Sequence, residues 1–316
     1  MISLIRNEWM KIFSKVSTYI FIGIIIVALI GTAILVKTIN NASDWRTGEE
    51  DNIAYNQAIL DDPNTSEEEK EMAKEDLARS QAKLDAGVNP NEATTWTYMV
   101  EQVTGVASFV TLFAVIICSS SVSSEFSDGT IKQLLIRPHK RWKILLSKYI
   151  STVLYAGVMV AVLMAAGYLI GLLFFGTGSF TEKMIDPGSF EAVKTIEAGP
   201  YFFNLMLYWI PGFLLILAIA FMLSTLFKSQ AIAVGVSVFI LFASSTLNSL
   251  ITFLVERYEW LKFVLFPHLD LRRYLMESMP MFDGATVGFS LGVLAIYYLL
   301  FMAIAFFAFQ KKDISI

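Results

Sequence analysis

The segment from Ser123 to Lys148, SSEFSDGTIKQLLIRPHKRWKILLSK, decides how the rest of this chain is arranged. It lies between two strongly apolar segments and contains six Lys and Arg residues against only Glu125 and Asp128. Because cytoplasmic loops of membrane proteins are rich in Lys and Arg, we expect a cytoplasmic loop. Within it, Gly129-Thr130 leads into an amphipathic turn, which Pro138 ends because proline has no amide hydrogen. The segment therefore predicts a short helix held against the membrane face.

The composition is that of a membrane protein. Of the 316 residues, 55% are apolar and 16% are charged, and the mean hydropathy is +0.59. The net charge of −4 argues against a nucleic-acid partner. A single cysteine, Cys118, excludes an intramolecular disulfide, and the two histidines lie far apart, which leaves no metal-ligand cluster.

Six apolar segments have the length of about 20 residues that a helix needs to cross a bilayer core. In lipid a helix bonds its own backbone groups, so we expect an all-α polytopic protein with six transmembrane helices. An even number of spans places both termini on one side. The predicted spans are 16–36, 103–122, 149–175, 204–226, 231–254 and 287–309.

The density of positive charge sets the predicted orientation. With both termini inside, the inner segments carry twelve Lys and Arg in 52 residues, and the outer segments carry twelve in 126. The denser side is the cytoplasmic one, because long translocated loops follow the charge bias poorly. We therefore expect a protein of the plasma membrane with residues 1–15, 123–148 and the tail 310–316 in the cytoplasm.

Residues 1–15 predict an interfacial helix, because apolar and basic residues separate onto two faces at helical spacing. The alternative, the start of a signal peptide, is rejected because the apolar segment that follows is too long and lacks a cleavage pattern. The outer segment 37–102 predicts an acidic helical hairpin, since Ser66 to Glu69 reads as a capping box and Gly87 ends the second helix. Its role is open between recognition of a partner and a solvated surface.

Two further outer segments are expected. Residues 176–203 read as a polar loop with Gly and Pro turn signals, and 255–286 as two short helices that dip into the interface. Pro211 predicts a kink in the fourth span. The polar run at the end of the fifth span faces either a translocation path or a neighbouring helix; its residues are Ser244, Ser245, Thr246 and Asn248.

The segment from Ser123 to Lys148 also resembles a known family. Written as E-x3-G-T-x3-L-L-x2-P-x2-R-x3-L-x2-K, it is similar to the loop between the second and third spans of type-2 ABC exporter permeases. In that family the loop holds a coupling helix that docks on the ATPase subunit. The alternative is that this segment is an ordinary basic loop with no coupling role. The resemblance implies that the ATPase contacts include Glu125, Phe126, Asp128, Gly129, Thr130, Leu134, Pro138 and Arg141.

The chain also lacks the sequence motifs of nucleotide-binding proteins and enzymes. The chain has no G-x-x-x-x-G-K-[ST] loop and no evident catalytic triad, so it is not expected to be an enzyme or to hold a cofactor. The resemblance implies a permease subunit that exports an amphiphilic cargo, such as a peptide, an antibiotic or a lipid-like molecule. It would work in the lipid membrane with a second permease copy or paralogue and with cassette ATPases that bind ATP and Mg²⁺. The alternative function is a membrane sensor or immunity protein that binds an antimicrobial peptide through the acidic hairpin.

Overall fold

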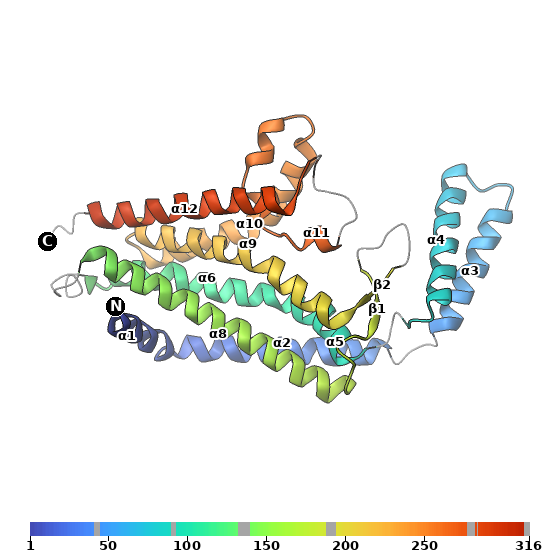
Figure 1. Ribbon diagram of the computed structural model, residues 1–316, viewed down its shortest axis with the longest axis horizontal. Coiled ribbons are helices and arrows are strands. Elements are labelled where there is room, and N and C mark those ends of the chain that lie inside the picture. Colours follow the sequence, from blue (N-terminus) through green and yellow to red (C-terminus); the bar gives the residue numbers. More distant parts are fainter. Residues whose placement is uncertain are drawn as a thin grey trace.

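The computed structural model describes residues 1–40, 45–89, 93–131, 140–187, 194–276, 282 and 284–312. Among these residues, six helices are long and apolar enough to cross a membrane, so the chain is an all-α polytopic membrane protein, as predicted. The spans, shown in Figure 1, are α2 (Val16–Asn40), a continuous run of α5 (Thr95–Tyr98), the π-helical η1 (Met99–Val103) and α6 (Thr104–Ser127), then α8 (Arg141–Phe175), α9 (Ala198–Leu226), α10 (Gln230–Leu254) and α12 (Val287–Lys311).

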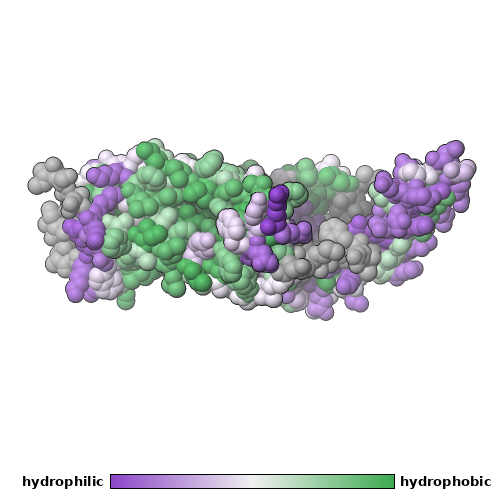
Figure 2. Space-filling view, turned by 90° about the horizontal axis from the view of Figure 1, so that it is seen from above, coloured by the Kyte–Doolittle hydropathy of each residue, from purple (hydrophilic) through white to green (hydrophobic). Residues whose placement is uncertain are grey.

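Helices α6 and α9 form the centre of the bundle. In the most apolar part of each, 72% and 61% of the residues are buried, against 28% or less in the other four spans. In the view of Figure 1, α2 and α8 lie to one side of this pair and α12 to the other. The apolar surface of the outer helices forms a broad band between two hydrophilic ends (Figure 2), which is the distribution that a bilayer requires.

Several spans are longer than hydropathy predicts. The second begins at Thr95 and ends at Ser127 instead of covering 103–122, and the third begins at Arg141 instead of at 149. The added turns are polar, and their side chains find partners inside the protein; Ser123 Oγ, for example, donates to the carbonyl of Ser119 at 2.7 Å. The connection predicted as 123–148 is therefore only 128–140, and Glu125 belongs to the last turn of a span, not to a loop.

One end of the bundle carries the N-terminal helix α1 (Ile2–Phe13) and the C-terminal end of α12 (Figure 1). We call it the termini end. As predicted, α1 is a separate helix before the first span. Ser14 Oγ donates to the carbonyl of Lys11 at 3.0 Å and Thr18 Oγ1 to that of Ile12 at 2.6 Å. Such side-chain bonds to the backbone compete with helical hydrogen bonds, and this is where α1 ends and α2 starts.

The opposite end carries a helical hairpin of α3 (Trp45–Asp61) and α4 (Glu67–Ala86) (Figure 1). The predicted capping box is confirmed: Ser66 Oγ accepts from the amide of Glu69, whose carboxylate accepts from the amide of Ser66 at 3.0 Å. Gly87 follows with φ +63°, a left-handed conformation that glycine adopts without strain. The hairpin closes through the ion pair of Lys83 with Glu49 at 2.7 Å.

The two other segments that were predicted to be outer loops, 176–203 and 255–286, differ in detail from the prediction. Strands β1 (Lys183–Ile185) and β2 (Thr195–Glu197) pair antiparallel, with Met184 opposite Ile196. Strands of three residues are too short to leave an alternating pattern in the sequence, so only turns were predicted there. In place of two interfacial helices, the described part of 255–286 forms the 3-10 turns η2 (Glu259–Phe263) and η3 (Phe266–His268) and the single turn α11 (Arg273–Met276).

Pro211 lies inside α9, as predicted, and the residue after it, Gly212, decides how the segment between α10 and α12 packs. A Cβ added at Gly212 would lie only 1.7 Å from the carbonyl oxygen of Leu269. Only glycine permits this approach, and it brings the chain that follows η3 against the middle of α9.

Candidate functional site

A ring of four alternating charges, three of them largely buried, joins three helices at the termini end. The ammonium of Lys148, on α8, lies 2.7 Å from Glu125 Oε1, on α6, and 2.8 Å from Glu8 Oε2, on α1. The ammonium of Lys11 lies 3.0 Å from Glu8 Oε1 and 3.0 Å from Glu125 Oε1, which closes the ring. The side chain of Lys148 is 1% exposed. We call these four residues the ion-pair ring.

Mutual attraction compensates the burial of these charges. Moving an ion from water into a protein interior costs roughly several kcal/mol, unless a partner of opposite charge compensates this cost. Burial alone would raise the pKa of Glu8, but the ammonium groups of Lys148 and Lys11 outweigh it and hold that pKa below its ordinary value. Burial would likewise lower the pKa of Lys11, but Glu125 and Glu8 raise it. Glu8 and Lys11 are therefore both charged near neutral pH.

The end of α6 turns sharply after the ring. The amide of Asp128 donates to the carbonyl of Ser124 at 2.8 Å, and Gly129 follows with φ +69°. Glycine adopts this left-handed conformation without strain, so it terminates the helix. Asp128, Gly129 and Thr130 are exposed, whereas Ile131 is buried. The rest of the predicted coupling helix, with Leu134 and Pro138, lies outside the described residues.

Cations from one helix cap the carboxyl end of another. Arg141, in the first turn of α8, donates from Nη1 to the carbonyls of Gln310 at 3.2 Å and Lys312 at 3.4 Å. Lys312 donates to the carbonyl of Thr225 at 2.8 Å, and its ammonium lies 4.2 Å from the ring centroid of Phe126. The last carbonyls of a helix carry partial negative charge, so each contact is favourable. Arg141 thus joins α8 to the end of α12, and Lys312 joins the end of α12 to α9 and α6.

A serine completes the connection to the short loop after α9. Ser127 Oγ donates to the carbonyl of Lys228 at 3.1 Å and accepts from the amide of Gln230 at 2.9 Å. The described segments at the termini end, which are α1, the loop 227–229 and Lys312, are therefore each bonded to the end of α6 or the start of α8.

The polar run of α10 lies at the other predicted site. Ser244, Ser245 and Asn248 line a groove of about 800 Å³ between α6, α9, α10 and the chain after η3. Thr246 is exposed and is not part of the lining, because it falls on a different side of the helix. Ser244 Oγ and Ser245 Oγ donate to backbone carbonyls of α10, at 2.6 Å and 3.0 Å. We call this cavity the groove.

The groove combines apolar and charged chemistry. Arg272 forms two parallel hydrogen bonds to Asp270, from Nε at 2.8 Å and from Nη2 at 2.7 Å, and both residues line it. Glu101 and Arg273 line it as well. The rest of the lining is rich in aromatic side chains: Phe109, Trp209, Phe213, Phe242 and Phe266.

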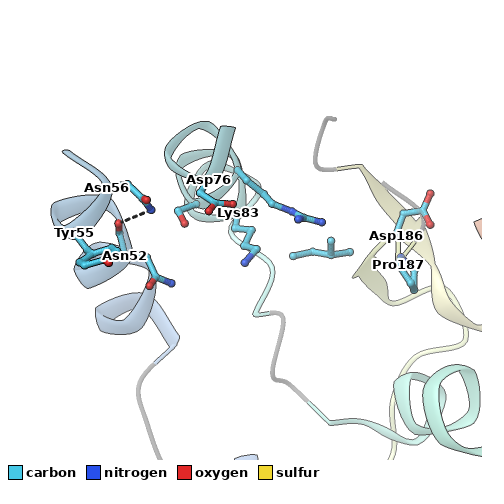
Figure 3. Close-up of a pocket in the computed structure, with 10 residues that line it drawn as sticks. Asn52, Tyr55, Asn56, Asp76, Lys83, Asp186 and Pro187 are labelled. Carbon is cyan, nitrogen blue, oxygen red and sulfur yellow. Dashed lines mark hydrogen bonds between the residues drawn. The ribbon is translucent and has the colours of Figure 1, made fainter. Parts of the chain in front are cut away.

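A polar cleft of about 460 Å³ lies between the α3–α4 hairpin and the end of β1 (Figure 3). Asn52 and Asn56 of α3, Asp76 and Lys83 of α4, and Asp186 after β1 all line it. The side-chain amide of Asn56 donates from Nδ2 to the backbone carbonyl of Asn52 at 2.9 Å. Acids, bases and amides are thus mixed in this cleft.

Sequence reasoning found part of the ring. It singled out Glu125 and Lys148 through the family pattern, but it missed Glu8 and the capping role of Lys312. Glu8 is the only acid in α1 and stands three residues before Lys11, a spacing that suggests no more than a local pair. Its contact with Lys148 spans 140 residues and could not be read from spacing.

These features define a six-helix membrane protein with a charged, bonded termini end and an amphiphilic groove. Residues 81–315 match the family described as "Protein of unknown function (DUF2705)", and the chain belongs to this family. It is 34% identical over 330 residues to "Uncharacterized protein YhcI" of Bacillus subtilis (strain 168), and the match covers 100% of both chains. It is also 32% identical over 203 residues to "Uncharacterized membrane protein YdbK" of the same organism, over 64% of this chain and 76% of that protein. The second name agrees with the six spans, and neither name states a transport function.

Proposed function

We propose that the chain is the transmembrane subunit of an ATP-driven exporter of the type-2 ABC kind. It works in the plasma membrane with both termini in the cytoplasm, paired with a second permease copy or paralogue and with cassette ATPases that bind ATP and Mg²⁺. Its cargo is amphiphilic. The observation that carries the proposal is the bonding of the last turn of α6, which directly precedes the 128–140 connection, to α1, to α8, to the loop after α9 and to the residue after α12.

A membrane protein that is driven by another polypeptide needs a point where force enters. The exposed turn at Asp128 to Thr130 is such a point, and the ion-pair ring holds the helix before it to α1 and α8. Helix α6 then runs through the centre of the bundle to the groove, which it lines with Thr104 and Thr111. A push on the turn therefore reaches the groove through one rigid helix.

The chemistry of the groove supports an amphiphilic cargo. Aromatic side chains suit an apolar tail, whereas Asp270, Arg272 and the hydroxyls of Ser244 and Ser245 suit a polar or charged head. A groove lined only by apolar side chains or only by polar side chains would not favour an amphiphilic cargo.

Co-expression with cassette ATPases of the same organism tests the proposal. We expect the two proteins to copurify and cargo to stimulate ATP hydrolysis. Gly129→Val should abolish the stimulation, since a β-branched residue cannot hold φ +69° without strain. Gly284→Val is the matched control, because Gly284 has φ +81°, has equally open surroundings, and lies in the segment before α12.

Recovery of the chain without an ATPase, or equal stimulation in the Gly129 variant and the wild type, would refute the exporter proposal. Loss of stimulation in both glycine variants would also refute it, because the effect would then be general and not specific to the turn.

The polar cleft favours a second candidate function, a sensor or immunity protein that binds a cationic antimicrobial peptide. Residues 45–86 carry twelve acidic against five basic residues, and part of this charge lines the cleft in Figure 3. Replacing 45–86 by a short linker separates the two functions. The sensor loses peptide binding and protection and needs no ATPase, whereas the exporter keeps its ATPase partner.

A further inference from the structure

A buried histidine holds the segment that forms one wall of the groove. Residues 259–274, which we call the wall segment, run from η2 through η3 into α11. Within this segment, η3 packs against α10 and α12, and His268 is fully buried there, with 0% of its surface exposed. The wall segment contributes five residues to the lining of the groove: Phe266, Leu269, Asp270, Arg272 and Arg273.

Both ring nitrogens of His268 have hydrogen-bond partners on neighbouring elements. Nε2 lies 2.9 Å from the carbonyl oxygen of Lys262, in η2, and Nδ1 lies 2.7 Å from Ser290 Oγ, in α12. A carbonyl oxygen can only accept, so Nε2 carries the hydrogen, and Nδ1 accepts from the hydroxyl of Ser290. The neutral imidazole therefore connects η2 to α12.

A proton can add to Nδ1 only if the bond to Ser290 reverses its direction. The ring would then donate from Nδ1 to Ser290 Oγ, and the hydroxyl of Ser290 would donate to Tyr274 Oη, 2.8 Å away. Tyr274 in turn can donate to the carbonyl of Thr286 at 3.3 Å. The hydrogen bonds can therefore be kept when His268 is protonated, and the consequence of protonation is the added charge.

The surroundings of the ring are apolar where the spans and the aromatic side chains meet it. The rings of Phe282 and Phe289 are T-shaped to it, with centroids 5.9 Å and 5.6 Å away. The helix α10 and residues 287–296 of α12 contain no titratable side chain. A charge buried in such surroundings without a partner of opposite sign is strongly unfavourable.

The wall segment itself offers the protonated ring no counter-charge. Asp270 is bound to Arg272 by two hydrogen bonds, and no described acid forms an ion pair with His268. Burial lowers the pKa of His268, and among the described groups only the carbonyl of Lys262 raises it. The titratable residues of the wall segment are Glu259, Lys262, Asp270, Arg272, Arg273 and Tyr274, while Glu277 and Asp283 lie outside the described residues.

We propose that protonation of His268 releases the wall segment from α12 and opens the groove. While the ring is neutral, it connects η2 to α12, and the carbonyl of Leu269 lies against Gly212 of α9. Once the ring is charged, it leaves its apolar surroundings for water, and the wall segment moves with it. This acid-sensitive opening does not rest on the exporter proposal, because it occurs whether or not the groove carries cargo.

The direction of the pH dependence follows from the lower pKa of the closed state. In the open state the ring is in water and has its ordinary pKa of about 6.5. The closed state therefore keeps its full advantage above that pH. Below it, the equilibrium constant for opening rises by up to about tenfold for each unit of pH, which is the limit for one proton. The rise ends at the lower pKa of the closed state.

Electron–electron resonance distances between two spin labels measure the opening in the full-length protein. One label is attached at Trp260→Cys, in η2, and the other at Leu207→Cys, in α9, because these residues are exposed by 65% and 61%. The labels are attached at neutral pH, and the native Cys118 is buried and stays unlabelled. We expect a second, longer distance to appear as the pH is lowered from about 8 to about 5, on either side of the ordinary pKa.

The control pair is Leu207→Cys with Leu173→Cys, which is exposed by 80% in α8. It joins two spans without the wall segment, so its distance should not change with pH. A change in both pairs would indicate general unfolding of the bundle and would overturn the inference.

Two variants that cannot be protonated at position 268 test the role of the histidine. In His268→Gln the side-chain amide can donate to the carbonyl of Lys262 and accept from Ser290, so the wall segment should stay closed at every pH in this range. His268→Met repeats the test with an apolar side chain. His139→Gln is the matched control, since His139 is the other histidine of the chain, and it should open as the wild type does.

An unchanged distance in the wild type at about pH 5, well below the ordinary pKa of a histidine, overturns the inference. Acid opening to the wild-type extent in either variant at position 268 also overturns it. Loss of opening in His139→Gln would assign the acid response to His139 and would overturn it as well.

Discussion

The ammonium of Lys148 lies 2.7 Å from Glu125 Oε1, within a bundle of membrane helices, and its side chain is 1% exposed. The two residues are 23 positions apart, one near the end of α6 and one in α8. Glu8 and Lys11 of α1 complete the same ring. Three of these four charges are largely buried, which a membrane protein tolerates only when they pair, and here the pairing fixes an N-terminal helix to two spans.

Removing Lys148 should destabilise the protein strongly. Lys148→Met leaves Glu8 and Glu125 buried with only Lys11 between them, and breaking a buried pair in this way costs about 3–5 kcal/mol. Thermal unfolding in detergent measures the loss. Lys70→Met is the control, because its pair with the exposed Glu67 at 3.7 Å contributes about 1 kcal/mol or less. Equal effects in the two variants would contradict a compensating ring.

Stability should be constant over a plateau at intermediate pH and should decline on both sides of it, along an acid limb and an alkaline limb. The pKa of Glu8 is lowered by folding, so its contribution is complete above the ordinary value of about 4.3 and is lost as the pH falls through the lower folded pKa. The pKa of Lys11 is raised, so its contribution is complete below about 10.4 and is lost as the pH rises through the higher folded pKa.

Melting temperature measured from pH 3 to pH 11 checks both limbs. Glu8→Gln should lower the plateau and flatten the acid limb. An acid limb as steep as that of the wild type in this variant would assign it to other carboxylates.

Gly212→Ala should displace the segment around Leu269 from α9. The new Cβ would lie 1.7 Å from the carbonyl oxygen of Leu269, so that segment must move or the protein loses stability, by about 2 kcal/mol or more. Gly235→Ala in α10 is the matched control. It has open space around the new Cβ and should be neutral or stabilising by up to about 1 kcal/mol. Thermal unfolding distinguishes the two, and indistinguishable melting curves would rule out the close packing.

Cysteine labelling should locate the two ends of the bundle. Ser127→Cys, exposed at the termini end, should react with an impermeant maleimide only after lysis, whereas Glu68→Cys, exposed on α4, should react on intact cells. The native Cys118 is buried and should remain silent in both variants. Labelling of Ser127→Cys on intact cells would invert the proposed orientation and remove the cytoplasmic access that an ATPase needs.

The sequence determined the features that depend on neighbours along the chain. Apolar segments long enough to cross a bilayer predicted the six spans, and Ser66, Glu69 and Gly87 predicted how α4 starts and ends. These predictions succeeded because hydropathy, capping bonds and left-handed glycine act within a few residues.

Only the tertiary structure decided where polar residues are compensated. It extended α6 to Ser127, paired Glu8 with Lys148 across 140 residues, and placed Ser245 but not Thr246 in the groove. The sequence does not show whether the charge of a residue is compensated by water or by a residue on a distant helix. The choice between them rests on which helices pack together, and that depends on the energy of the whole bundle rather than on any single segment.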